Sequence, residues 1–166
     1  MAAGQLERYR HADPAFEIDL PPGTEVGTMP GMLVVARAPE DASSSPFRTN
    51  LTVVAQELPP GTGPRALAEA SLAEAARSFP GWRLIDRAPA RLGELTAERT
   101  LATYLPSRRS GVDFGRPLSV AVEQWRVLHG GLAWILSASC ETPDYGCFGD
   151  VWRACAASWR PGEAGG

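Results

Sequence analysis

The sequence predicts an α+β fold, in which a mainly antiparallel sheet of about six or seven strands has helices packed on its faces as an α/β/α-type sandwich. Two observations carry this prediction. Strand-like and helix-like segments follow the chain as three strands, a helix, four strands and a helix, without regular alternation of strand and helix. In addition, two apolar runs meet at Gly130-Gly131, which is a hairpin signal.

A single globular domain is expected. The chain has 166 residues, of which 44% are hydrophobic, and this is enough for one core. We expect a flexible leader over residues 1–14, a globular domain over residues 15–160 and a flexible tail over residues 161–166. The N-terminal segment lacks the apolar run of a signal peptide, and no stretch approaches the roughly 18 apolar residues of a membrane span. A cytoplasmic protein without stable membrane insertion is therefore expected.

The first strands are predicted by alternation and by apolar runs. Residues 16–20 alternate apolar and acidic side chains, which is typical of a half-buried strand, and Pro21-Pro22-Gly23 ends it. Residues 32–38 are a largely apolar run that indicates a more buried strand. Residues 42–46 contain three serines and are expected to form an exposed loop, and residues 50–58 form a third strand.

A helix and two further strands follow. The helix begins at Pro64, because proline is tolerated in the first helical turn, and ends at Pro80-Gly81. Residues 82–92 and 95–105 predict two strands joined at Gly93-Glu94, and the segment 106–117 is the longest expected loop. The apolar side of the helix is expected to carry Ala68, Leu72, Ala75, Ala76 and Phe79.

The glycine pair fixes the register of the hairpin. The tight turns that suit strand twist need positive φ, which glycine adopts freely, so His129 is expected opposite Leu132 and Glu123 opposite Ala138. The opposite strand face is mixed, which suits a half-covered or binding surface. The apolar face carries Trp125, Val127, Trp134, Leu136 and Ala138.

A final helix follows the hairpin. Thr142, Pro143 and Asp144 predict its start, since threonine can cap free amides and proline fits the first turn. Pro161-Gly162 ends it. The simplest packing lays the apolar stripe of the helix on the apolar face of the hairpin. That stripe consists of Phe148, Val151, Trp152, Cys155 and Trp159.

Charge and composition exclude several classes of function. The formal charge of −3 argues against a nucleic-acid binder. All 16 basic residues are arginine, which excludes a phosphate-binding loop lysine, a Schiff-base lysine and a Ser-x-x-Lys nucleophile. His11 and His129 have no sequence neighbours that suggest catalysis. No cofactor is expected.

The three cysteines fit no even disulfide framework and lack the paired spacing of a zinc site. Free thiols are expected in a reducing compartment, with Cys155 in the core. A bridge between Cys140 and Cys147 is the alternative for an exported protein.

Two charged features remain open to more than one interpretation. The register places Glu123 on the apolar face, where a charge is costly unless it is paired. It either meets water or an arginine, or takes part in acid–base chemistry with another carboxylate. The Arg108-Arg109 pair either recognises an acidic partner or is solvated surface.

Several short motifs resemble a known fold. They are Phe16-Glu17-Ile18-Asp19-Leu20-Pro21, Phe47 with Asn50-Leu51-Thr52-Val53, Leu92-Gly93 with Ala97, Gln124, Gly131-Leu132-Ala133 and Ser158-Trp159. Together they resemble the PsbP-like fold, which is shared with the nuclear-transport factor Mog and the bacterial DcrB-like proteins. Thr24 and Glu94 depart from the pattern, which often has an aromatic residue and a glycine there. The resemblance implies an antiparallel sheet between helices and a non-enzymatic role as adaptor, chaperone or assembly factor, without catalytic residues.

These observations lead to a functional hypothesis. We expect a non-enzymatic protein-binding module that holds a partner polypeptide on a sheet face and adjoining loops. The alternatives are a small-molecule or lipid-binding protein of the same fold, and an enzyme that uses buried carboxylates. The sequence leaves open whether the chain forms a homodimer. The candidate partner-binding residues are Arg108, Arg109, Phe114, Arg116, Val122, Gln124, Arg126 and Ile135.

Overall fold

The computed structural model of the chain describes residues 5–106 and 116–162. Two short 3-10 turns, at Glu40–Ala42 and Thr142–Asp144, accompany the regular elements. Neither helix in the described ranges has the length and apolar character needed to cross a bilayer. The elements are β1 (Glu7–Ala12), β2 (Ala15–Leu20), β3 (Glu25–Met29), β4 (Met32–Arg37), β5 (Asn50–Glu57), α1 (Pro64–Ser78), β6 (Arg83–Leu92), β7 (Leu95–Tyr104), β8 (Val120–His129), β9 (Leu132–Glu141), α2 (Tyr145–Ser158) and β10 (Arg160–Pro161).

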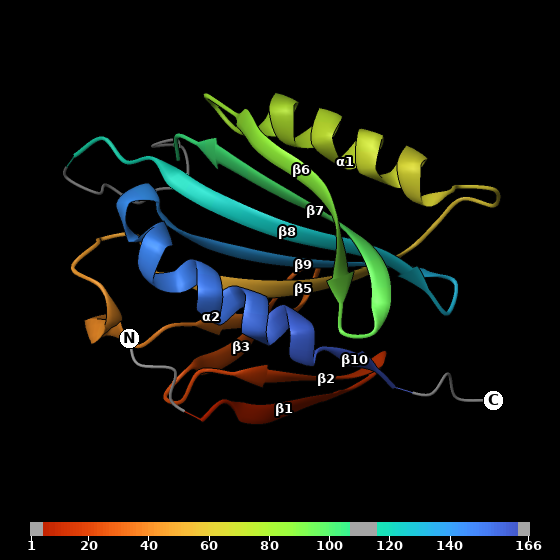
Figure 1. Cartoon of the computed structure of the whole chain (residues 1–166), viewed down its shortest axis with the longest axis horizontal. Helices are drawn as coiled ribbons and strands as arrows, with labels where there is room; N and C mark the ends of the chain where they lie inside the picture. The colour runs from red at the N-terminus through yellow and green to blue at the C-terminus, as the bar shows by residue number, and fades with distance from the viewer. Residues whose placement is uncertain (1–4, 107–115, 163–166) are drawn as a thin grey trace.

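The strands form two antiparallel sheets. The larger sheet has seven strands in the order β3-β4-β5-β9-β8-β7-β6, and the smaller one has three in the order β1-β2-β10. Figure 1 shows α1 on one side of the large sheet and α2 on the other. The predicted α+β class, with a mainly antiparallel sheet and helices on its faces, is confirmed.

The predicted hairpin lies at the centre of the large sheet. His129 pairs with Leu132 and Glu123 with Ala138, as the glycine turn predicts. Gly130 and Gly131 have φ of 60° and 77°, the left-handed region that glycine adopts without steric cost. The turn therefore sorts the side chains of β8 and β9 between the two faces of the sheet.

The apolar face of this hairpin forms the core with α2 and the small sheet. Trp134 lies edge-on against Phe16 of β2 and Trp159 at the end of α2, with ring centroids 5.7 and 5.2 Å apart. The predicted stripe of α2 faces this core, since all its members are buried except Val151, which is half-buried. Aromatic packing thus joins three parts of the chain.

The edges of the fold differ from the sequence prediction. The expectation of a loosely ordered leader is wrong for Glu7–Ala12, which form β1. Most residues of this strand are polar, and Arg8 holds it to β2 through Glu17 and Asp19, a contact without a sequence signal. The short strand β10, at the start of the expected tail, and the exposed edge strand β3 were also not predicted.

The two helices differ in detail from the prediction. Leu67, Ala68 and Ala75 are the buried residues of α1, whereas Phe79, expected on its apolar side, follows the helix and is exposed. At the start of α2, the Thr142 hydroxyl donates to the Ser119 carbonyl at 2.9 Å and caps no helical amide. Thr142 therefore bonds to the residue just before β8 in place of the start of its own helix.

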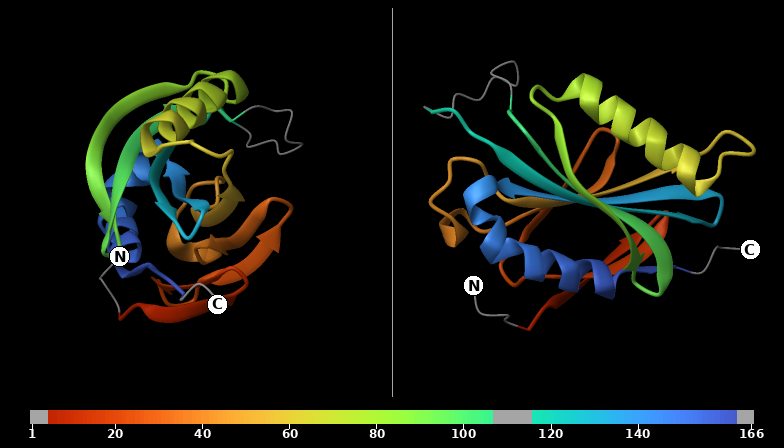
Figure 2. Two further views of the ribbon diagram at one scale, coloured as in Figure 1. Left: turned by 90° about the vertical axis from the view of Figure 1, so that its right-hand side faces the viewer. Right: turned by 45° about the horizontal axis from the view of Figure 1, so that its top comes forward.

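The turn between β6 and β7 docks on the end of α2. Figure 2 shows the large sheet curving so that these two strands bend around the helix. The Gly93 amide donates to the Ala156 carbonyl at 2.8 Å. Gly93 has φ of +57°, and a Cβ at this position would lie 1.9 Å from the Trp159 carbonyl oxygen. Only glycine fits this contact.

We expect Gly93→Ala to destabilise the protein more than Gly31→Ala does. Gly31 also has positive φ, at +78°, but no atom lies within 4 Å of its Cβ position. Its substitution adds only backbone strain of about 1–2 kcal/mol. Gly93→Ala adds overpacking of about 1–3 kcal/mol. Urea unfolding followed by tryptophan fluorescence measures both, and equal losses would show that the turn is not docked.

Candidate functional site

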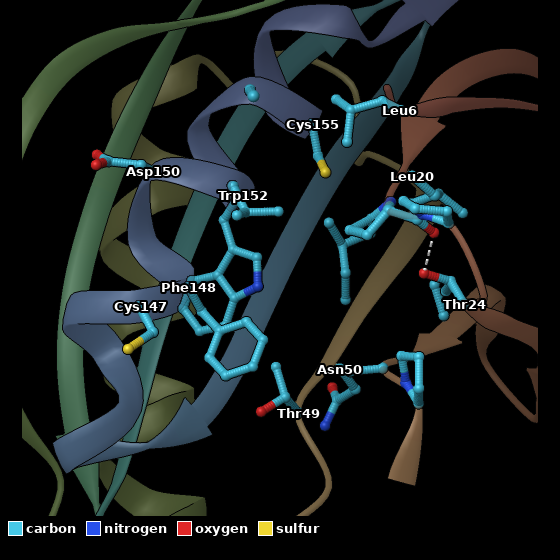
Figure 3. A pocket seen from close by; sticks show the side chains of 18 of the residues that line it. Leu6, Leu20, Thr24, Thr49, Asn50, Cys147, Phe148, Asp150, Trp152 and Cys155 are labelled. Atoms are coloured by element: carbon cyan, nitrogen blue, oxygen red, sulfur yellow. Dashed lines mark hydrogen bonds between the residues drawn. The ribbon is translucent and has the colours of Figure 1, made fainter. Parts of the chain in front are cut away.

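A pocket of about 580 Å³ lies between α2 and strands β2, β4 and β5. Leu20, Ala36 and Leu51 line it from the strands. Trp152 and Cys155 line it from the helix (Figure 3). All five side chains are buried. A volume of this size and an apolar lining are typical of small-molecule sites.

Few polar side chains face the pocket. The Thr24 hydroxyl donates to the Pro21 carbonyl at 2.6 Å, and the Asn50 amide donates to the Arg48 carbonyl at 3.1 Å. The Thr49 hydroxyl is buried and has no hydrogen-bond partner among the described residues. The remaining lining side chains with hydrogen-bonding groups are Cys147, Asp150, Cys155 and, through its indole N–H, Trp152.

The thiols near this pocket differ in accessibility. Burial raises the pKa of Cys155, and that of Cys140, to about 12, so both stay protonated at neutral pH. Cys147 is exposed where it lines the pocket. All three are free thiols, so no Cys140–Cys147 bridge is present.

The sequence did not predict this pocket. Its helical side combines Val151, Trp152 and Cys155 of the predicted stripe with Cys147 and Ala154 beside the stripe. The sequence signal is that the apolar surface of α2 extends beyond the predicted stripe. The strands that face it could not be identified before the path of the helix was known.

The predicted mixed face lies beneath α1. Arg126 on this face is only 3% exposed. Its Nε donates to Ser71 of α1 at 3.0 Å, its Nη1 to Thr100 at 2.9 Å and its Nη2 to Gln124. Burial lowers the pKa of Arg126 to about 10, so the guanidinium stays charged at neutral pH among neutral oxygens.

The other predicted residues have different surroundings. Val122 is buried, while Ile135 and Gln124 are half-buried, so the structure brings these three and Arg126 onto one covered face. Arg108, Arg109 and Phe114 lie outside the described residues. A role of any of these residues in partner binding stays a prediction.

Arg116 is exposed and bound to a neighbouring carboxylate. Its guanidinium donates to both oxygens of Glu141, at 2.6 and 2.8 Å. This pairing holds the pKa of Glu141 below its usual range. The geometry shows that Arg116 can clamp a carboxylate, and in this conformation the carboxylate belongs to the chain itself.

Glu123 is fully buried, and three side chains contact its carboxylate. It binds Arg99 of β7, accepts from the Tyr145 hydroxyl at 3.0 Å and lies 3.5 Å from Arg153 of α2. Arg99 in turn pairs with Asp86 of β6 at 2.8 Å. The arginine expected beside Glu123 is therefore present. A carboxylate held by three groups suits anchoring of α2 better than proton transfer.

We expect Glu123→Ala to destabilise the fold by about 3–5 kcal/mol, because it leaves Arg99 without its buried partner. Glu74→Ala is the matched control, since it breaks an exposed arginine pair on α1 and should have a much smaller effect. Thermal or urea unfolding measures both variants. Similar losses for the two would show that the Glu123 cluster does not anchor the helix.

Comparisons with known proteins give likeness in structure alone. No protein-family model and no curated protein matches the sequence. A Pseudomonas aeruginosa protein of unknown function, PA94, named as a candidate regulator, superposes with a TM-score of 0.64 at 12% identity, covering 97% of this chain and 100% of that one. Cyanobacterial PsbP (CyanoP) of Synechocystis sp. PCC 6803 gives 0.62 at 16% identity, with 98% and 96% covered. LpqN of Mycobacterium tuberculosis, involved in cell envelope biogenesis, gives 0.64 at 14% identity, with 94% and 91% covered. The chain therefore has the PsbP-like fold that its sequence motifs resemble.

Proposed function

We propose that this protein is a non-enzymatic binding module that holds an apolar molecule, such as a lipid chain, in the pocket beside α2. The observation that carries this proposal is the pocket itself, about 580 Å³ in volume and lined mainly by apolar side chains. Its walls are a helix and strands, elements that hold their side chains in fixed positions. The three structural neighbours, none of which is described as an enzyme, support a non-catalytic role.

The chemistry of the pocket also favours binding over catalysis. The titratable side chains of its described lining are Cys147, Asp150 and Cys155. Cys155 is protonated, and Asp150 accepts from Arg153 at 2.7 Å. A nucleophile needs a general base within hydrogen-bond reach, and no histidine lines the described pocket.

We expect the uncharged fluorescent probe N-phenyl-1-naphthylamine to bind the wild-type protein, and Ala154→Phe to weaken binding about 10-fold or more. Ala154 is exposed and lines the pocket, so a phenyl ring there fills the entrance without disturbing the core. A tenfold loss corresponds to about 1.4 kcal/mol, or about 60 Å² of apolar contact denied to the probe. Titration by fluorescence measures the affinity.

Ala157→Phe is the control, because Ala157 is exposed on the same helix but does not line the pocket. It should leave probe affinity unchanged. Protection of exposed Cys147 from iodoacetamide by bound probe gives a second measurement. Equal affinities of the two variants would place the probe elsewhere and contradict the proposal.

An exposed apolar cluster supports a second candidate, a protein-binding surface. Phe79 contacts Tyr104 and Trp82, with ring centroids 4.7 and 6.0 Å apart. Leu84 and Ile85 follow Trp82 closely in the chain, in the first residues of the edge strand β6, and Ile85, at a register shift, is 53% exposed. Exposed apolar clusters of this kind are typical of protein interfaces. The partner that can be tested directly is a second copy of the chain.

We expect Ile85→Asp to abolish self-association of the protein while changing stability by no more than about 0.5 kcal/mol. Val26→Asp is the control, because Val26 is a similarly exposed apolar residue on the opposite edge strand, β3. Light scattering after size exclusion, over a range of protein concentrations, measures the mass. A wild-type chain that stays monomeric throughout would exclude a second copy as the partner.

A further inference from the structure

We propose that the pocket selects an uncharged amphiphile, an apolar chain with one neutral polar end such as a hydroxyl or amide, over a fatty-acid-type anion. This inference rests on the proposed function and specifies its ligand. It follows from the charges around the pocket, from the hydrogen-bonding groups of the lining and from the polar groups at one of its ends.

The charge of the lining disfavours an anion. Among the described lining residues, Asp150 is the one carboxyl side chain, and none is an arginine or a histidine. Arg48, next to the lining in sequence, already contacts other groups, since its Nε donates to the Ala38 carbonyl at 2.9 Å and its Nη2 lies 2.7 Å from Glu25, in an ion pair without hydrogen-bond alignment. A carboxylate entering this pocket would lose water and gain no counter-charge.

The hydrogen-bonding groups of the lining disfavour a polypeptide segment. Each residue of such a segment brings an N–H and a C=O that need partners once they are buried. The Thr24 hydroxyl and one of the two Asn50 amide hydrogens of this lining already bond within the chain. A hydrocarbon chain makes no such demand and gains stability from every apolar contact.

Two neutral groups offer partners for a single polar end. The Thr49 hydroxyl is buried without a partner, and the Asn50 carbonyl oxygen accepts no hydrogen bond within the described residues. Figure 3 shows these two side chains at the same end of the pocket. A ligand hydroxyl there can donate to the Asn50 carbonyl oxygen, and a change of the Thr49 side-chain rotamer would let its hydroxyl bond to the same end. This arrangement fits an alcohol or amide terminus.

The test compares 1-decanol with decanoate as competitors of N-phenyl-1-naphthylamine at pH 7.5, below the concentrations at which either aggregates. The two molecules share one chain length and differ in the charge of the end group. We expect decanol to displace half of the probe at a concentration at least about 10-fold lower than decanoate. A capped, leucine-rich uncharged peptide is the third competitor.

A variant that adds a positive charge tests whether the missing counter-charge is what disfavours an anionic ligand. Gly146→Arg places a cation next to Cys147, toward the end of the pocket that holds Thr49 (Figure 3), and no atom lies within 4 Å of the Gly146 Cβ position. We expect it to improve competition by decanoate about 3- to 5-fold, the effect of a partly exposed ion pair, without improving competition by decanol. Ala157→Arg adds the same charge to the same helix away from the pocket and should leave both competitors unchanged.

Three outcomes would overturn the inference. Decanoate competing as well as decanol would show that the pocket does not exclude an anion. Displacement by the peptide but not by decanol would show that the occupant is a polypeptide segment, and failure of both amphiphiles would show that neither fits. In each case the proposed binding function still stands if Ala154→Phe weakens probe binding and Ala157→Phe does not.

Discussion

The register of the central hairpin is the constraint on which the rest of this fold depends. Because side chains alternate along a strand, a slip of one residue would place Gln124 and Arg126 on the face now held by Glu123 and Trp125. The face that α2 and the small sheet cover would then be polar. The turn at residues 130–131 prevents the slip, so two residues without side chains decide where both helices lie.

Patterns of short range predicted most of the fold. Alternation, helical spacing and glycine turns identify β2, both helices and the main strands, and even the pairing of Glu123 with Ala138. Features that arise only between distant segments were not predicted. Strand β1 is held to β2 by ion pairs. The position of α1 depends on the hydrogen bond between Ser71 and Arg126, which lie 55 residues apart in the chain. The pocket is also such a feature, because it lies between one side of α2 and strands that the sequence of α2 does not identify.

The covered face beneath α1 shows why a mixed pattern is difficult to interpret. A buried arginine without a carboxylate partner within hydrogen-bond reach is costly unless neutral oxygens solvate it, and Ser71, Thr100 and Gln124 do so here. The same polar residues that suggest an open surface in the sequence therefore hold a helix in place. The contact between α1 and the sheet is otherwise small, with Leu67, Ala68 and Ala75 as its buried residues.

The fixing of α2 at both ends has a consequence for the pocket beside it. At its start, Tyr145 bonds to Glu123 and the preceding Asp144 to Ser43, and at its end the Ala156 carbonyl accepts from Gly93. The helix cannot move away from the strands without breaking these contacts, so the distance between the walls is set before anything binds. Under the proposed function, a bound chain should therefore gain affinity with each added carbon only until the cavity is full, because further carbons remain in water.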